Sequence, residues 1–113
     1  VSGALNGDPR AQYALLTWQD GRWQVEHRAV PYDLDRVRRA FRERGLLAEG
    51  GPFARAYLLS IETGRNVVGH LLSHIDQVAA ETGHEEWVVV PETVWDQAVS
   101  TFRWDDYADE PRS

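Results

Sequence analysis

The sequence contains neither cysteine nor methionine. Without cysteine the chain can form no disulfide, no thiolate metal site and no thiol nucleophile. It has no apolar run close to the roughly 20 residues of a membrane-spanning helix, so we expect no membrane insertion. No signal peptide is recognisable, and we expect a cytoplasmic protein. Because the chain begins Val1-Ser2-Gly3 without an initiator methionine, we expect a fragment or a processed chain.

Basic residues are outnumbered, with 12 Lys and Arg against 18 Asp and Glu and a net charge of -6. Binding to nucleic acid requires a basic face, so we expect no nucleic-acid partner. One basic cluster stands out, formed by Arg36, Arg38, Arg39, Arg42 and Arg44. Such a cluster could bind phosphate or an acidic partner. We favour the simpler interpretation of a solvated helix face paired with nearby Asp35 and Glu43.

The first regular structure that the sequence predicts is a β-hairpin. Residues 11–18 and 23–30 are rich in apolar and aromatic side chains, and they flank Gln19-Asp20-Gly21-Arg22. The dipeptide Asp-Gly is typical of tight hairpin turns, which require positive φ angles. Alternate residues of a strand point to opposite faces, so Trp23, Val25, His27 and Ala29 share one face. Residues 24, 26 and 28 lie on the other face, which we expect to be wet.

The rest of the chain has helical periodicity, over residues 33–44, 52–62, 66–83 and 91–102. Asp33 and Asn66 are good N-caps, while Gly45 and Gly83 are typical stops. Gly50-Gly51-Pro52 predicts a break between the first two helices. Residues 87–90 form a short apolar run that fits either a strand or an extended link.

These patterns predict an α+β fold with one N-terminal β-hairpin followed by about four helices. We divide the chain into a loop and hairpin (1–32) that completes a sheet, a helical segment (33–104) and an acidic tail (105–113). We expect the chain after Trp104 to be loose because it is strongly charged.

One stretch resembles a known family; it reads Asn6-Gly7-Asp8-Pro9-Arg10-Ala11-Gln12-Tyr13-Ala14-Leu15-Leu16. It is similar to the C-terminal region of calcineurin-like metallophosphoesterases of the bacterial and archaeal single-domain type. The similarity continues through Trp23-Gln24-Val25-Glu26 and Val30-Pro31-Tyr32-Asp33. It is close over residues 1–33 and weaker beyond them. The resemblance implies that this chain is the C-terminal part of an α/β sandwich enzyme.

The resemblance also implies a function, which is phosphoester hydrolysis at a site with two divalent ions, Mn, Fe, Zn or Mg. Such ions bind phosphate oxygens and generate hydroxide near neutral pH. The implied partners are a phosphoester substrate and the N-terminal remainder of the enzyme, or a homodimer mate. The loop residues Asn6, Asp8 and Arg10 would line the substrate site. The alternative is a hairpin-entry turn in which Asp8 and Arg10 hold the backbone, and both interpretations stay open.

The family's metal-binding motifs are missing from this sequence. Asp-x-His and Gly-Asn-His do not occur, and Gly7-Asp8 lacks the later Asp of its motif because Ala11 stands there. Gly69-His70 lacks the second His because Leu72 follows at that position. We therefore assign no catalytic residue and no metal ligand in this chain, and we expect the two-metal site in the missing N-terminal part.

Two other functions are compatible with the sequence. The chain could be a free-standing, non-catalytic interaction module that pairs through its sheet edge or a helical face. It could also be a small metal-binding regulator, because His70 and His74 lie four residues apart on a predicted helix and so share a face. We favour a solvated polar face for these two histidines, since no carboxylate lies between them.

Overall fold

The computed structural model describes residues 5–84 and 89–108. The elements are, in chain order, β1 (Ala11–Gln19), β2 (Arg22–Val30), α1 (Leu34–Glu43), α2 (Leu46–Thr63), α3 (Val67–Glu81), α4 (Glu92–Thr101) and α5 (Asp105–Ala108). The predicted α+β fold, a hairpin followed by helices, is confirmed. The run at 87–90 lies partly outside the described residues, because Trp87 and Val88 are not among them.

The hairpin turn has the geometry that its sequence predicts. Asp20 and Gly21 both have positive φ angles, 54° and 76°. Two positive φ angles define the type I′ turn, whose twist matches that of the flanking strands. The antiparallel register runs without interruption from Gln19 opposite Arg22 to Ala11 opposite Val30. The turn is thus two residues long, and each strand is one residue longer at the turn than predicted.

The helices α1 and α3 begin where their capping residues predict. The Asp33 carboxylate accepts a hydrogen bond from the Arg36 backbone N–H at 3.1 Å. The Asn66 side chain accepts one from the Gly69 N–H at 2.9 Å. Each bond satisfies one of the backbone donors that a helix leaves unpaired at its N-terminus.

The helix α2 differs from the prediction, because it begins at Leu46 rather than at Pro52. The chain bends at Gly51, whose φ of 56° and ψ of -138° are not helical. Glycine tolerates this conformation, and Pro52 suits the first turn of the helix that follows. The Gly-Gly-Pro sequence therefore marks a bend with helical chain on both sides, and not the beginning of helical structure.

The core lies among α2, α3, α4 and α5. Its buried side chains are Ala56, Val67, Leu71, Ile75, Val78, Ala79, Val94, Ala98, Phe102, Trp104 and Tyr107. We expected the chain after Trp104 to be loose, and this is wrong for residues 105–108, which form α5. Tyr107 is only 9% exposed and stacks on Phe102 with ring centroids 5.8 Å apart. One buried aromatic ring thus anchors an otherwise charged segment.

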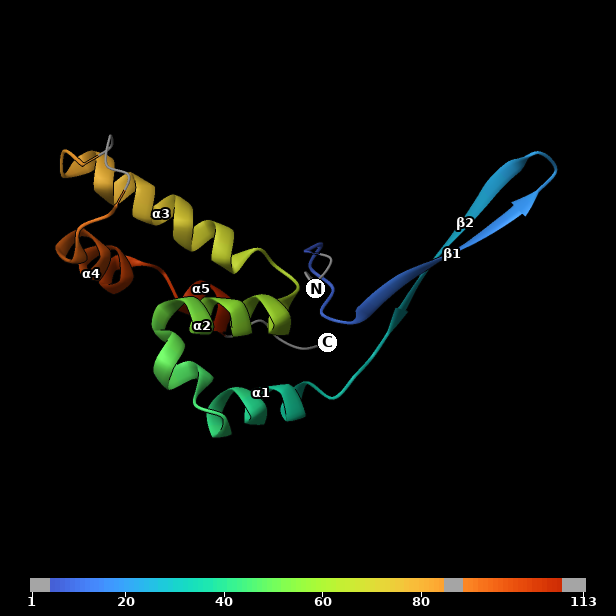
Figure 1. Ribbon diagram of the computed structural model, residues 1–113, viewed down its shortest axis with the longest axis horizontal. Coiled ribbons are helices and arrows are strands. Elements are labelled where there is room, and N and C mark those ends of the chain that lie inside the picture. Colours follow the sequence, from blue (N-terminus) through green and yellow to red (C-terminus); the bar gives the residue numbers. More distant parts are fainter. Residues whose placement is uncertain (1–4, 85–88, 109–113) are drawn as a thin grey trace.

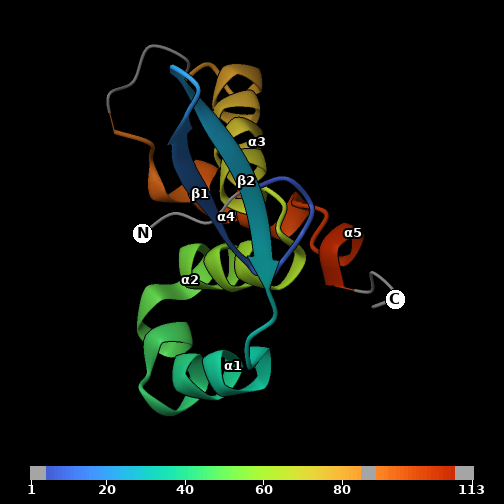
Figure 2. The ribbon, with the colours of Figure 1, turned by 90° about the vertical axis from the view of Figure 1, so that its right-hand side faces the viewer.

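The hairpin projects away from the helices, as Figure 1 shows for β1 and β2. The molecule measures 58 × 36 × 26 Å, with a radius of gyration of 18.1 Å. A compact chain of this length would have a radius of gyration of about 13 Å. Figure 2, turned by 90°, shows β1 and β2 in front of the helices, which lie behind and below them. The described residues thus form two regions: a helical body (34–84 and 89–108) and a projecting hairpin (11–30).

Candidate functional site

The loop before β1 is held by an amide pair between Asn6 and Gln12. The Asn6 Nδ2 donates to Gln12 Oε1 at 2.8 Å, and Gln12 Nε2 donates to Asn6 Oδ1 at 3.0 Å. Gln12 Nε2 also lies 3.2 Å from the Asp8 carbonyl oxygen. These bonds close residues 6–12 into a compact turn, which fixes the point where the hairpin begins.

Asp8 and Arg10 form a bidentate ion pair within this turn. The Arg10 Nη2 donates to Asp8 Oδ2 at 2.7 Å, and Arg10 Nε lies 3.0 Å from Asp8 Oδ1. The Arg10 backbone N–H also donates to Asp8 Oδ1 at 3.0 Å. The side-chain hydrogen bonds from Arg10 are the main reason that the pKa of Asp8 is lowered, and the backbone hydrogen bond is the second. The same side-chain bond raises the pKa of Arg10. The carboxylate therefore stays ionised and engaged with Arg10.

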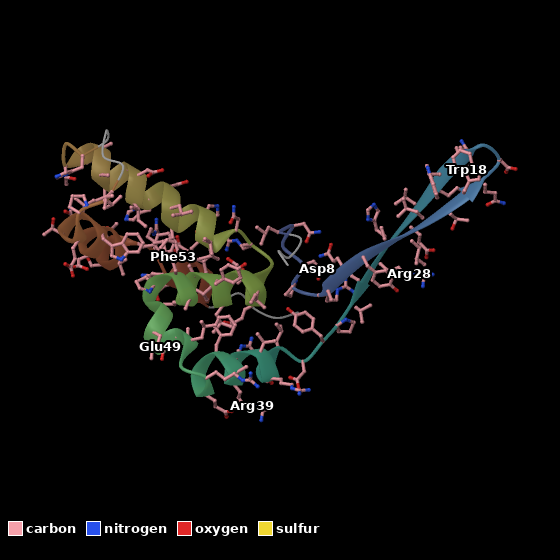
Figure 3. The ribbon with its side chains drawn as sticks, in the orientation of Figure 1. Asp8, Trp18, Arg28, Arg39, Glu49 and Phe53 are labelled. Carbon is pink, nitrogen blue, oxygen red and sulfur yellow. The ribbon has the colours of Figure 1, made fainter. Side chains whose placement is uncertain are left out.

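The same turn contacts the end of α2. The Gly7 N–H donates to the Gly64 carbonyl at 2.8 Å. Gly64 has a φ of 69°, and a side chain there would begin 2.7 Å from backbone atoms of Asp8. Only glycine fits this approach. The turn is thus seated on the helical body, and Figure 3 places Asp8 between the helices and the hairpin.

The structure brings the predicted candidates Asn6, Asp8 and Arg10 together, with many of their polar groups bonded within the turn. The neighbouring cavity, lined by Arg10 and Tyr32 among others, measures about 100 Å³. Ligand pockets usually measure ~300–1,000 Å³. The cavity beside the turn is therefore too small to hold a typical ligand by itself.

The histidines of α3 lie on a partly solvated face, as we favoured, since His70 is exposed and His74 is half-buried, but both also make tertiary contacts. The His70 Nδ1 lies 2.7 Å from the Tyr107 hydroxyl, and His74 Nε2 lies 2.8 Å from Thr101 Oγ1. Each imidazole also packs against an aromatic ring, Tyr107 or Phe102. The two side chains therefore link α3 to α4 and α5, through contacts that sequence spacing alone could not reveal.

The arginine cluster of α1 is divided by the fold. Arg38 turns towards α2, where its Nε donates to Glu62 Oε2 at 2.6 Å, and its Nη1 donates to Asp35 Oδ1 at 2.6 Å. Burial lowers the pKa of Arg38, but the bonds to Glu62 and Asp35 outweigh it, so the net direction is upward. The other four arginines are exposed; they are Arg36, Arg39, Arg42 and Arg44. The expected pairing with Asp35 is confirmed, for Arg38.

The most unusual surface is one face of the hairpin. The register places eight residues on it: Gln12, Ala14, Leu16 and Trp18 of β1, and Trp23, Val25, His27 and Ala29 of β2. Trp18 and Trp23 are cross-strand partners in edge-to-face contact, with ring centroids 5.3 Å apart. Each is 60% exposed, as is Leu16. We call this surface the apolar hairpin face.

Sequence analysis identified the β2 half of this face but not its exposure. The period-2 pattern indicates which residues share a face, and it cannot say whether another part of the chain covers them. In the structure, the described helices leave the face open. Large exposed apolar patches commonly mark sites of contact with other polypeptides.

Two larger hollows lie on the helical body. One measures about 490 Å³ and is almost entirely apolar, with Phe41, Phe53 and Tyr57 among its lining residues. The other measures about 540 Å³ and includes Arg55, whose guanidinium lies 4.2 Å from the centre of the Trp104 ring. Neither hollow adjoins the turn at residues 6–12.

The described residues do not fit a two-metal centre. In residues 5–84 and 89–108, no three His, Asp or Glu side chains converge in a way that could hold a metal ion. Within the same ranges, no helix combines the length and the apolar character that crossing a membrane requires. Comparisons with protein families, with curated proteins and with solved structures found no match to this chain.

Proposed function

We propose that this chain is the C-terminal part of a metal-dependent phosphoesterase, and that it has a structural role there. In this proposal the hairpin packs against the remainder of the enzyme and completes its sandwich. Phosphoester hydrolysis takes place at a two-metal site formed by residues outside this chain. The whole enzyme acts in the cytoplasm.

The observation behind this proposal is that the motif resembling the family leads directly into a hairpin whose apolar side chains are exposed. The motif spans residues 6–16, from the turn at Asn6 into the middle of β1. The hairpin that it begins presents Leu16, Trp18 and Val25 to solvent. Burying such side chains is favourable by roughly 1.5–3 kcal/mol for each aliphatic one, so a hairpin of this composition suits a covered position. A further layer of protein would provide that cover.

The turn at Asn6, Asp8 and Arg10 would then lie at the rim of the catalytic site. Hydrogen bonds within the turn keep it rigid, and a rigid support suits a side chain that positions a substrate. The Arg10 bonds to Asp8 use Nε and Nη2. The remaining Nη1 group is the donor that we propose for a phosphate oxygen.

The two divalent ions, Mn, Fe, Zn or Mg, would be held by ligands outside this chain. They would supply Lewis-acid activation of phosphate and a metal-bound hydroxide. Of the chain's four histidines, His70 and His74 contact Tyr107 and Thr101, and Asp8 is engaged with Arg10. We therefore assign no catalytic step to this chain.

The test is the intact mass and activity of the protein purified from its native source. We expect a mass above the 12.9 kDa of this chain and hydrolysis of a nitrophenyl phosphate diester or monoester that a chelator abolishes. The 113-residue chain alone should show no turnover with Mn²⁺, Mg²⁺ or Zn²⁺. Turnover by the short chain, lost in a point variant of it, would contradict the proposal, and so would an inactive native protein.

The second candidate is a free-standing interaction module, favoured by the same exposed hairpin. Exposed strand edges readily add a strand from another polypeptide. Intact mass separates the two candidates. A native protein of 12.9 kDa that binds a partner through its hairpin would support the module and contradict the enzyme.

A further inference from the structure

The two strands of the hairpin expose different sets of backbone groups. In an antiparallel ladder, hydrogen-bonded pairs alternate with pairs whose N–H and C=O groups point outward. The two-residue turn makes Gln19 and Arg22 a hydrogen-bonded pair, so the next pair, Trp18 and Trp23, points outward. The outward residues of β1 are therefore Gln12, Ala14, Leu16 and Trp18. The described sheet has two strands, so within it these groups have no partner strand.

The two edges differ in the features that prevent strand pairing. The strand β1 contains no charged residue, no proline and no glycine in its nine residues. The strand β2 contains Arg22, Glu26 and Arg28. Charges on edge strands are a common device against association, as are prolines and bulges. The edge of β1 has none of these protections.

We propose that the open edge of β1 pairs with β1 of a second copy of this chain, in antiparallel orientation. Self-pairing brings no like charges together, because β1 has none. A two-fold axis at Leu15 would place Ala14 opposite Leu16 of the partner subunit, and Gln12 opposite Trp18 of the partner subunit. All of these residues have outward backbone groups, so every one of their donors meets an acceptor. The result is a four-stranded antiparallel sheet.

The shape of the molecule suits this arrangement, and the symmetry of the contact limits it to two copies. The hairpin projects from one side of the helical body (Figure 1), so antiparallel pairing places the two bodies at opposite ends of the sheet. The outer edges of the four-stranded sheet are then the two β2 strands, with Glu26 and Arg28. A symmetric contact of this kind closes on itself and does not continue into a filament. The pairing uses the edge, so the apolar hairpin face stays available to the rest of the proposed enzyme.

Amide hydrogen exchange of the 113-residue chain at high concentration tests the edge directly. The amides of Ala14 and Leu16 point outward, and so do those of their cross-strand partners His27 and Val25. A hairpin without a partner strand leaves all four equally open to exchange. Of these four amides, we expect slowed exchange only at Ala14 and Leu16, and loss of that protection on dilution. Protection at His27 and Val25, or at none of the four, would overturn the proposal.

Matched variants test the same edge by sedimentation equilibrium. Ala14→Pro removes an outward N–H of β1, and His27→Pro removes the corresponding N–H of β2. We expect a dimer for the unchanged chain and for His27→Pro, and a dissociation constant at least about tenfold higher for Ala14→Pro. A monomer at every concentration, or equal weakening by both prolines, would contradict the proposed edge.

A second matched pair keeps the test decisive if proline disrupts the hairpin. Thr17 and Gln24 are cross-strand partners on the face opposite the apolar one. Thr17→Lys adds a charge to the β1 edge, and Gln24→Lys adds the same charge to β2. We expect Thr17→Lys to weaken the dimer more than Gln24→Lys. Equal effects, or a larger effect of Gln24→Lys, would overturn the proposal. Thr17 and Gln24 lie neither in the turn at residues 6–12 nor on the apolar hairpin face, so this second pair tests the edge independently of the proposed enzyme function.

Discussion

The helical body and the hairpin use similar side chains in opposite ways. Leu71 of α3 is fully buried, whereas Leu16 of β1 is 60% exposed. Trp104 is packed inside the body, while Trp18 lies near the far end of the hairpin (Figure 3). The same chain thus contains a region that satisfies its own hydrophobic pattern and one that does not. The difference is the one that we expect if another polypeptide covers the hairpin, as proposed above.

Local interactions explain why the hairpin nevertheless has a defined conformation. The turn at Asp20 and Gly21 selects the register, and the Trp18–Trp23 contact stabilises the strands next to it. A two-stranded hairpin is marginally stable by itself in water. We infer that partner contacts supply the rest of its stability.

The largest expected effect comes from making the same substitution, leucine to alanine, in each of the two regions. Leu71→Ala should destabilise the body by about 2–5 kcal/mol, because it removes buried methyl groups and leaves a cavity. Leu16→Ala should change the unfolding free energy by less than ~0.5 kcal/mol in dilute solution, where the hairpin has no partner. Urea unfolding followed by helical circular dichroism measures both. Similar losses for the two variants would show that the comparison is wrong.

A second prediction concerns the place where the two regions meet. Gly64→Ala should cost about 1–3 kcal/mol, because φ is positive and the new methyl group would meet the Asp8 backbone. Gly21→Ala is the control, since its φ is also positive but a methyl group there meets no neighbouring atom. We expect Gly21→Ala to loosen the hairpin and leave the helical melting temperature unchanged. A neutral Gly64→Ala would mean that the turn does not dock on α2.

A third prediction compares an ion pair in each region. Glu62→Gln should destabilise the body by about 1 kcal/mol, because it removes the charge facing the partly buried Arg38. Its control is Glu26→Gln, which alters the exposed Glu26–Arg28 pair of the hairpin. Exposed pairs contribute little, so the control should show no measurable change in thermal unfolding. A larger loss for Glu26→Gln than for Glu62→Gln would contradict this account.

The smallest effect is the pH dependence of the turn before β1. Hydrogen bonds from Arg10 lower the pKa of Asp8. The stabilisation from this pair is therefore complete above the ordinary aspartate pKa of about 3.9, and it is lost as pH falls through the lower folded-state value. Carboxylate titration by NMR should show an Asp8 pKa below about 3.9, and Arg10→Gln should return that pKa towards about 3.9. An Asp8 that titrates normally in the unchanged chain would contradict the pairing.

Much of the local structure could be predicted from single residues. Asp20-Gly21 fixed the expected turn, and Asp33 and Asn66 marked the starts of α1 and α3. In each case a short-range rule decides the conformation, because the turn or cap uses neighbouring backbone groups. The bend at Gly51 was harder to interpret, since Gly-Gly-Pro is compatible with both a break and a bend within helical chain.

The tertiary contacts could not be predicted in the same way. Asp105 and Asp106 indicated a loose tail, yet the burial of Tyr107 decides the structure there. His70 contacts Tyr107, which is 37 residues away in sequence, and His74 contacts Thr101, which is 27 residues away. Of the candidate site, the sequence could identify the residues of the turn and half of the apolar hairpin face. Their bonding and exposure depend on how the helices pack.

The most direct test of the central claim is amide hydrogen exchange at a concentration low enough to keep the chain monomeric. We predict slow exchange in the core of α3, at Leu71 and Ile75, and exchange orders of magnitude faster throughout β1 and β2. That result would show a helical body that is stable alone and a hairpin that needs a partner. Protection of the hairpin amides equal to that of α3 in the dilute monomer would contradict the account.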